Sequence, residues 1–255
     1  MKYFVVSDVH SFLDPLKAAL EEKGFDSSND EHCLIVCGDL FDRGKQSYEL
    51  LTFVMSLPRK ILIRGNHEYL LEECCYRSFP LTHDKQNGTV STIQSIGGSV
   101  KPSDFAHCCK VTLDKTQAYR DSLVNYFETK NYIFVHSWIP TRKVSVPNTA
   151  DKWIPLTSDE WMEDWRNAND VQWEDAMWGN PFQMWQQGLN QTGKTIVFGH
   201  WHCSAGHRIA GRCNSEFEYA IWEPFYGEGV IAIDRCTAHT GQVNVLVLED
   251  SPLES

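Results

Sequence analysis

The stretch IVCGDLFDRG, residues 35–44, decides the fold class because it joins a buried apolar run directly to a polar loop. The same form recurs at FVVSDVH (4–10), ILIRGNHE (61–68), IFVHS (133–137) and IVFGHWH (196–202). Short apolar runs that end in a polar loop are typical of buried strands. Helical patterns at residues 13–20 and 46–57 separate the stretches at 4–10, 35–44 and 61–68. Strands that alternate with helices predict an α/β fold with at least some parallel pairing.

The alternation is interrupted between residues 78 and 130. This segment contains proline, a Gly-Gly pair and two helical patterns, which predict helices over Thr89–Ile96 and Thr116–Thr129. We interpret residues 78–130 as a helical insertion between core strands. No stretch has the composition of an interdomain linker, so residues 1–255 are expected to form one domain.

The C-terminal region alternates apolar and polar residues, which is typical of antiparallel strands. Three strands are predicted there, over Phe217–Tyr226, Val230–Ile233 and Val243–Leu248. The last two are expected to form a hairpin around Thr240-Gly241. Asp234 and His239 flank this hairpin, and a role in its turn is favoured over an approach of either residue to the candidate site. Tryptophans gather between residues 153 and 185 at roughly helical spacing, so most are expected to pack in a core.

Composition and charge disfavour several classes of protein. The chain has 42% apolar residues, a formal net charge of −11 and a sequence pI near 5.3. An acidic chain is a poor partner for nucleic acid or an anionic membrane, so a phosphate-bearing substrate would need local positive charge, such as metal ions. No signal-like or membrane-spanning stretch is visible, and the nine cysteines are partly adjacent, so we expect a cytoplasmic protein with reduced thiols.

Five strand ends carry residue types that bind metals. The candidate ligands are Asp8, His10, Asp39, Asn66, His136, His200 and His202. One Asp-x-His after a strand is usually a solvated turn, but five such ends would converge on one edge of a sheet rich in parallel strands. A mixture of carboxylate, imidazole and amide oxygen without thiolate suits divalent ions, with Mn²⁺ expected and Fe or Zn²⁺ as alternatives.

This ordered set of motifs resembles that of the calcineurin-like metallophosphoesterases. The blocks at residues 38–44 and 66–68 are most similar to the phosphoprotein phosphatase branch, and the set extends from Asp8 to His202. The resemblance implies a central mixed β-sheet sandwich flanked by helices. It also implies two divalent metal ions and the hydrolysis of phosphate esters.

The resemblance implies a role for each candidate residue. The implied ligands are Asp8 and His10 for the first ion, Asp39 for both ions, and Asn66, His136 and His200 for the second. His202 would face the first ion. Arg43 would clamp phosphate oxygens as a bidentate donor, and His67, held and charged by Asp42, would protonate the leaving alkoxide.

Some positions depart from the phosphoprotein phosphatase pattern. Ser11 and Ser137 stand where that branch usually has glycine, and Trp178 begins a segment that only faintly matches its counterpart. The second phosphate-binding arginine is missing downstream of Trp178, where Lys194 is the basic residue. Arginines that could replace it in space are Arg142, Arg208 and Arg212. These departures leave two-metal chemistry intact and protein-phosphatase specificity open.

Residues 188–195, GLNQTGKT, match the P-loop pattern in letters alone. A P-loop follows a strand and opens a helix, so that the helix N-terminus faces the phosphates. Here a helical pattern precedes the glycines and a strand follows them, which is the reverse order. We therefore expect a helix end and a turn, without nucleotide binding by Lys194.

Three functions remain open from the sequence. The first is hydrolysis of phosphate monoesters by a metal-bridging hydroxide, including the activity of a serine/threonine-type protein phosphatase. The second is cleavage of a phosphoanhydride or diester, as in the diadenosine tetraphosphate hydrolases. The third is a non-catalytic scaffold, which is the least supported because every expected ligand is present.

Overall fold

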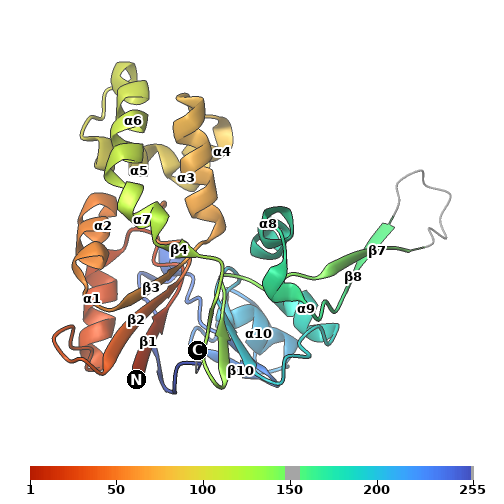
Figure 1. Cartoon of the computed structure of the whole chain (residues 1–255). Coiled ribbons are helices and arrows are strands. Elements are labelled where there is room, and N and C mark those ends of the chain that lie inside the picture. The colour runs from red at the N-terminus through yellow and green to blue at the C-terminus, as the bar shows by residue number, and fades with distance from the viewer. Residues whose placement is uncertain (147–155, 254–255) are drawn as a thin grey trace.

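The computed structural model describes residues 1–146 and 156–253, and its centre is a pair of five-stranded sheets (Figure 1). The first sheet has the order β12-β1-β2-β3-β4. Its strands are β1 (Lys2–Val6), β2 (His32–Cys37), β3 (Lys60–Ile63), β4 (Leu123–Val124) and β12 (Leu246–Glu249). All neighbours are parallel except β12, which runs antiparallel to β1. This arrangement confirms the α/β class predicted from the strand–helix rhythm.

The second sheet has the order β10-β11-β9-β6-β5. Its strands are β5 (Phe127–Glu128), β6 (Tyr132–Phe134), β9 (Thr195–Phe198), β10 (Phe225–Gly227) and β11 (Val230–Ala232). The three central strands are parallel, and each edge strand is antiparallel to its neighbour. Both sheets are therefore mixed, as the family resemblance implied.

Strand β1 shows why its apolar run is continuous. Tyr3 and Val5 belong to the core between the two sheets, whereas Phe4 and Val6 belong to the core between the first sheet and its helices. Successive side chains of a strand point to opposite faces, so a strand covered on both sides needs an apolar residue at every position. The core between the sheets also contains Phe134 and Val197 from the second sheet, which confirms the sandwich.

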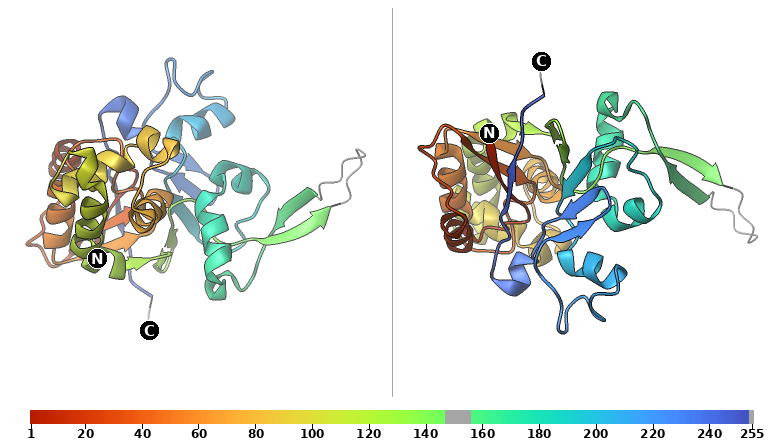
Figure 2. Two further views of the ribbon diagram at one scale, coloured as in Figure 1. Left: turned by 90° about the horizontal axis from the view of Figure 1, so that it is seen from above. Right: turned by 90° about the horizontal axis from the view of Figure 1, so that it is seen from below.

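Helices pack outside both sheets (Figure 2). Those associated with the first sheet are α1 (Leu13–Glu22), α2 (Ser47–Ser56), α3 (Asn66–Arg77), α4 (Thr82–Asn87), α5 (Thr89–Gly97), α6 (Phe105–Lys115) and α7 (Gln117–Asp121). The others are α8 (Asp170–Trp178), α9 (Pro181–Gln186), α10 (Cys203–Ile209) and α11 (Thr237–Thr240), and the short 3-10 turns are η1 (Pro102–Asp104) and η2 (Trp165–Asn167). No helix in the described part of the chain is long and apolar enough to cross a membrane.

The segment predicted as a helical insertion contains helices α4–α7, but one of its predicted helices is wrong. Helix α5 confirms the prediction over Thr89–Ile96. The predicted helix Thr116–Thr129 ends at Asp121 as α7, and strands β4 and β5 follow it. Strand β4 pairs with β3, and β5 pairs with β6. Tertiary pairing at the sheet edges therefore overrides the local helical pattern.

The predicted C-terminal hairpin is also wrong. Strands β11 and β12 lie in different sheets, with α11 between them, and the predicted strand Phe217–Tyr226 is reduced to β10 at its end. Strand β12 instead covers the edge of β1. Alternation indicates that a strand has one covered face, but it does not identify the strand's partner.

Two antiparallel strands, β7 (Arg142–Val146) and β8 (Leu156–Glu160), project from the body and were missed (Figure 1). The prediction that most tryptophans pack is confirmed for Trp165 and Trp173, which are buried in the core around the second sheet. Trp178 is exposed, and Trp153 lies outside the described residues.

Candidate metal centre

The carboxyl ends of five strands meet at one edge of the sandwich. Six predicted ligands come together there: Asp8 and His10 after β1, Asp39 after β2, Asn66 after β3, His136 after β6 and His200 after β9. All except His200 are buried, and His200 is partly buried. The parallel pairing of the sheets therefore collects residues that are up to 192 positions apart in the sequence.

Two groups of potential ligands share one carboxylate. His10, Asp39 and His67 form the first group, and Asp39, His136 and His200 form the second, each with ligand atoms within 4.8 Å of one another. The Asn66 amide oxygen joins the second group, 2.8 Å from His136 Nε2 and 3.0 Å from His200 Nδ1. Asp39 therefore occupies the position that a bridging ligand requires.

The imidazoles are held with lone pairs facing inward. His136 Nδ1 lies 2.9 Å from the Cys37 carbonyl oxygen and donates to it, which leaves Nε2 as an acceptor. That Nε2 lies 3.1 Å from His200 Nδ1 and also faces the Asn66 oxygen. In the same way, His10 Nδ1 donates to the Phe41 carbonyl oxygen over 2.8 Å. Such carbonyl partners orient metal-binding histidines, and converging lone pairs of this kind suit a cation.

Burial and charge together favour the ligand forms of His10, Asp39 and His200, but not that of Asp8. Burial lowers the pKa of His10 well below its usual value and that of His200 to about 3, which favours the neutral form of both rings. Burial opposes ionisation of Asp39, but the surrounding histidines lower its pKa overall. Burial and the charge of Asp39 raise the pKa of Asp8 to about 6. A cation would reverse that last shift, because it stabilises the ionised carboxylate.

The backbone around the centre is strained. Of the ten non-glycine residues with left-handed φ in the described ranges, seven lie in the loops of the centre. They are Asp8, His10, Ser11, Asp39, Asp42, Arg43 and His200. Such conformations cost roughly 1–3 kcal/mol each and persist where the surroundings fix them, which is typical of functional sites.

Two glycines permit the close approach of the loops. A Cβ atom at Gly65 would collide with the carboxylate of Asp39, and one at Gly199 would collide with Ser7 and Asp8. Each of these glycines directly precedes a candidate ligand, Asn66 or His200. The motif glycines are therefore explained by packing of the centre.

His67 and Arg43 stand at the exposed side of the first group. His67 Nδ1 lies 2.8 Å from Asp42 Oδ2, and His67 Nε2 lies 3.4 Å from an Arg43 guanidinium nitrogen. Burial lowers the pKa of His67, but the carboxylates of Asp39 and Asp42 outweigh it and raise the pKa to about 9. This raised pKa favours the protonated ring, which lies beside the exposed Arg43 guanidinium.

Asp42 is fixed by two threonines that the sequence analysis did not single out. Thr89 Oγ1 donates to Asp42 Oδ2 over 2.7 Å, and Thr92 Oγ1 donates to Asp42 Oδ1 over 2.8 Å. Both threonines lie on α5, in the helical insertion, and both are fully buried. Their spacing of three residues on a correctly predicted helix was the available signal, since it places both hydroxyls on one face.

The family follows from this centre and from sequence comparison. Residues 1–204 match the family model described as calcineurin-like phosphoesterase. The chain belongs to the calcineurin-like phosphoesterase family. The ordered motifs had already indicated this family, and the two ligand groups now give those motifs a shared position in space.

Curated relatives of this calcineurin-like phosphoesterase are named symmetrical bis(5'-nucleosyl)-tetraphosphatases. The one from Stutzerimonas stutzeri is 30% identical over 142 residues, which cover 55% of this chain and 45% of the relative. The one from Pseudomonas fluorescens is 24% identical over 201 residues, which cover 77% of this chain and 62% of the relative. The chain thus spans from about a quarter to three-fifths of the length of the curated relatives it matches.

Solved structures with the same fold include phosphatases of two specificities. A cold-active protein-tyrosine phosphatase of a psychrophilic Shewanella species has a TM-score of 0.56 and 16% identity, covering 97% of this chain and 75% of that one. A protein serine/threonine phosphatase from Saccharomyces cerevisiae has a TM-score of 0.52 and 14% identity, covering 100% and 81%. At these identities the likeness concerns the fold alone.

His202 lies outside both ligand groups of this phosphoesterase, so its predicted role stays a prediction. It directly precedes α10, and its ring packs 5.4 Å from that of Phe217 and 6.0 Å from that of Trp222. For Asp234 the sequence analysis favoured a turn role over an approach to the site, yet this carboxyl is buried just after β11, where burial and the charge of Asp8 raise its pKa. Its place after an apolar strand was the same signal that identified the ligands.

The basic residues considered as a second phosphate clamp are engaged elsewhere. Arg142 pairs with Glu160, Arg208 pairs with Glu216, and Arg212 lies over the Phe225 ring. Lys194 binds the Glu128 carboxylate over 2.8 Å and the Thr129 carbonyl oxygen over 2.6 Å. A helix, α9, precedes the P-loop-like segment and strand β9 follows it, as expected.

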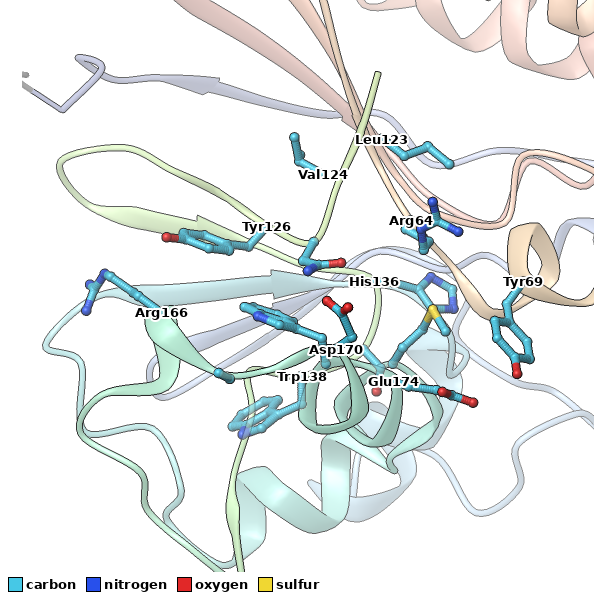
Figure 3. A pocket seen from close by; sticks show the side chains of 15 residues that line it. Arg64, Tyr69, Leu123, Val124, Tyr126, His136, Trp138, Arg166, Asp170 and Glu174 are labelled. Carbon is cyan, nitrogen blue, oxygen red and sulfur yellow. The ribbon is translucent and has the colours of Figure 1, made fainter. Parts of the chain in front are cut away.

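A pocket of about 810 Å³ adjoins the centre at His136 (Figure 3). Residues from distant segments line it, including Arg64, Tyr126, His136, Asp170, Trp173 and Glu174. Tyr126 stacks on Trp173 with a centroid distance of 5.3 Å and an interplanar angle of 7°. Arg64 is paired with Glu72 over 2.8 Å. The sequence analysis did not identify the residues that line this pocket, because local patterns cannot place distant segments together.

Proposed function

We propose that this chain is a two-metal hydrolase of phosphate monoesters. The observation that carries the proposal is the pair of ligand groups that share Asp39. Asp8 and His10 would hold the first divalent ion, and Asn66, His136 and His200 would hold the second. Mn²⁺ is the expected ion, with Fe or Zn²⁺ as alternatives. When bound, two such ions neutralise phosphate charge and supply a water-derived nucleophile at neutral pH.

Arg43 and His67 supply the phosphate contacts in this proposal. Their facing nitrogens are 3.4 Å apart, and a protonated His67 cannot accept a hydrogen bond from Arg43. An anionic oxygen between them would accept from both, which removes the repulsion of two donors. The exposed guanidinium can thereby orient the ester, while His67 faces its leaving oxygen.

His67 also supplies the proton for the leaving group. Asp42 accepts from Nδ1–H over 2.8 Å, which directs Nε2 toward the substrate side. An alkoxide leaves poorly without a proton, so transfer from Nε2 matters for alkyl esters such as phosphoserine. The same ring also belongs to the first ligand group, so the alternative role is that of a metal ligand. Metal content of a His67 variant distinguishes these two roles.

The direct test of this proposal is removal of the metal. Wild-type protein stripped with a chelator should lose turnover of p-nitrophenyl phosphate and phosphoserine esters, and added Mn²⁺ should restore it. Titration should give about two ions per chain. Undiminished activity in the stripped protein, with no metal remaining by elemental analysis, would refute the proposal.

A second candidate is cleavage of dinucleoside tetraphosphates. The curated relatives bear that activity in their names, and the pocket beside His136 offers chemistry for a nucleobase. Tyr126 provides an aromatic surface, and Asp170 and Glu174 provide carboxylates that accept hydrogen bonds from ring amino groups.

A substrate panel with Mn²⁺ separates the two candidates. It contains phosphopeptides, mononucleotides, diadenosine tetraphosphate and p-nitrophenyl phosphate. The anhydride expels a stable phosphate group, so its cleavage should depend little on His67, whereas phosphoserine esters should depend on it strongly. A kcat/KM at least a hundredfold higher for diadenosine tetraphosphate than for phosphopeptides would favour the second candidate.

A further inference from the structure

Glu68 joins the two loops that carry Asp39 and Asn66. Its carboxylate accepts backbone N–H bonds from Asp39 and Leu40, both over 2.9 Å, and from Gly65 over 2.8 Å. Glu68 itself is only 2% exposed. The end of β2 is thereby tied to the start of α3, which fixes the spacing of two candidate ligands.

A buried tyrosine from the helical insertion completes this junction. The Tyr119 hydroxyl, on α7, donates to Glu68 Oε1 over 3.1 Å. The other donor to Oε1 is the Leu40 N–H, whereas Oε2 accepts from both Asp39 and Gly65. Tyr119 is 2% exposed, so water cannot readily replace its hydroxyl. Loss of one donor to a buried carboxylate is costly because the charge stays desolvated.

The same tyrosine also reaches the first ligand group. Its ring packs edge-on against Phe41, with centroids 5.2 Å apart and an interplanar angle of 70°. The backbone carbonyl of Phe41 accepts the Nδ1–H bond that orients His10. The Tyr119 hydroxyl thus contacts Glu68, which holds the Asp39 loop, and the Tyr119 ring contacts Phe41, whose carbonyl oxygen orients His10.

We propose that Tyr119 is a positioning residue for the metal centre, through which the helical insertion sets metal affinity. This inference rests on the proposed metal-dependent function and extends it to a residue outside the motif set. Tyr119 acts through Glu68 on the loop that carries Asp39. Glu68 accepts hydrogen bonds from backbone N–H groups of that loop and not from the ligand side chains. Partners of ligands typically change metal affinity by about 10–100-fold when they are removed.

The test compares Tyr119→Phe with Tyr3→Phe. Both substitutions remove one hydroxyl from a tyrosine that is 2–3% exposed, but Tyr3 lies near the amino end of β1, away from the centre. Calorimetric titration of Mn²⁺ into chelator-stripped protein should give a Kd about tenfold weaker for Tyr119→Phe than for wild type. Tyr3→Phe should bind Mn²⁺ as wild type does. The Mn²⁺ concentration for half-maximal turnover should rise in parallel for Tyr119→Phe.

Thermal unfolding of the stripped proteins separates positioning from packing. A lower Tm for Tyr119→Phe with an unchanged Mn²⁺ Kd would overturn the inference, because the hydroxyl would then serve folding alone. A weaker Kd together with a wild-type protein that hydrolyses no phosphate substrate would support the inference and refute the proposed function. A wild-type protein that binds no Mn²⁺ would overturn both.

Discussion

Strands β6 and β9 have a charged cluster at each end, and the two clusters are built differently. At the amino ends, the Glu128 carboxylate is bound by Arg166 over 2.6 and 2.8 Å and by Lys194 over 2.8 Å. At the carboxyl ends, His136 Nε2 and His200 Nδ1 face one another beside the Asn66 amide oxygen and the Asp39 carboxylate. The first cluster carries its own cations. The second cluster consists of residues that could bind a cation from solution. We therefore expect the Glu128 cluster to contribute to stability and the histidine cluster to contribute to catalysis.

The substitution with the largest expected effect on this difference between the two clusters is Asp39→Asn. Asp39 belongs to both ligand groups, so one substitution should weaken both ions and lower turnover of p-nitrophenyl phosphate by at least about a hundredfold. His136→Ala should weaken only the second ion. Metal content after dialysis against limiting Mn²⁺ gives the comparison.

A matched control is Asp159→Asn, which removes a carboxylate from the projecting hairpin, where it pairs with Lys143. This control should keep its full metal content. Loss of only one ion in Asp39→Asn would contradict the bridging role, and equal losses in the control would show that the effect is not specific to the centre.

His67→Asn tests one proposed step at the candidate metal centre, the protonation of the leaving group. If His67 protonates the leaving alkoxide, turnover of phosphoserine esters should fall by about 10²–10⁴, and turnover of p-nitrophenyl phosphate should fall much less, because phenolate leaves without help. Metal content should match wild type. His83→Asn, which alters an exposed histidine that faces Asp84, is the control. Loss of an ion in His67→Asn would make His67 a ligand of the first group.

The contrast also explains what could be predicted from the sequence. The ligands were found because strand ends such as Gly38-Asp39 and Gly199-His200 are local patterns, and parallel pairing brings them together. Strand pairing in the C-terminal region was mispredicted because the residues of β12 pair with residues of β1 that are 241–247 positions away in the sequence. The Glu128 cluster, the pocket at His136 and the contacts of Tyr119 depend on distant segments, which no local pattern reports.

Glu128→Gln tests the amino-end cluster, where the expected effect is on stability. Removal of the charge leaves Lys194 and Arg166 without their carboxylate, so the free energy of unfolding at pH 7 should fall by about 1–3 kcal/mol, with metal binding unchanged. Burial raises the pKa of Glu128, but the hydrogen bonds from Arg166 and Lys194 outweigh it and lower the pKa.

The pH dependence of this effect has a defined sign. The folded pKa lies below the unfolded one, so the stabilisation is fully present above the unfolded pKa, about 4.3. It is lost as pH falls through the folded pKa. Urea unfolding of wild type and Glu128→Gln should therefore give curves that differ at pH 7 and approach each other in acid. A constant difference across that range would contradict the ionic role of Glu128.

Lys194→Ala should produce the smallest effect, and it tests whether the two ends are separate. Lys194 is held by Glu128 and by the Thr129 carbonyl oxygen, at the opposite end of β9 from His200. Turnover of an aryl phosphate should therefore stay within a few-fold of wild type, while stability falls by about 1 kcal/mol because Arg166 still pairs with Glu128. Asn190, whose side chain binds the Lys194 carbonyl oxygen, offers a neighbouring control as Asn190→Ala, which alters the same turn without removing a charge. A loss of turnover above about a hundredfold in Lys194→Ala alone, equivalent to about 2.7 kcal/mol of transition-state stabilisation, would make Lys194 the missing phosphate clamp and would join the two ends into one functional site.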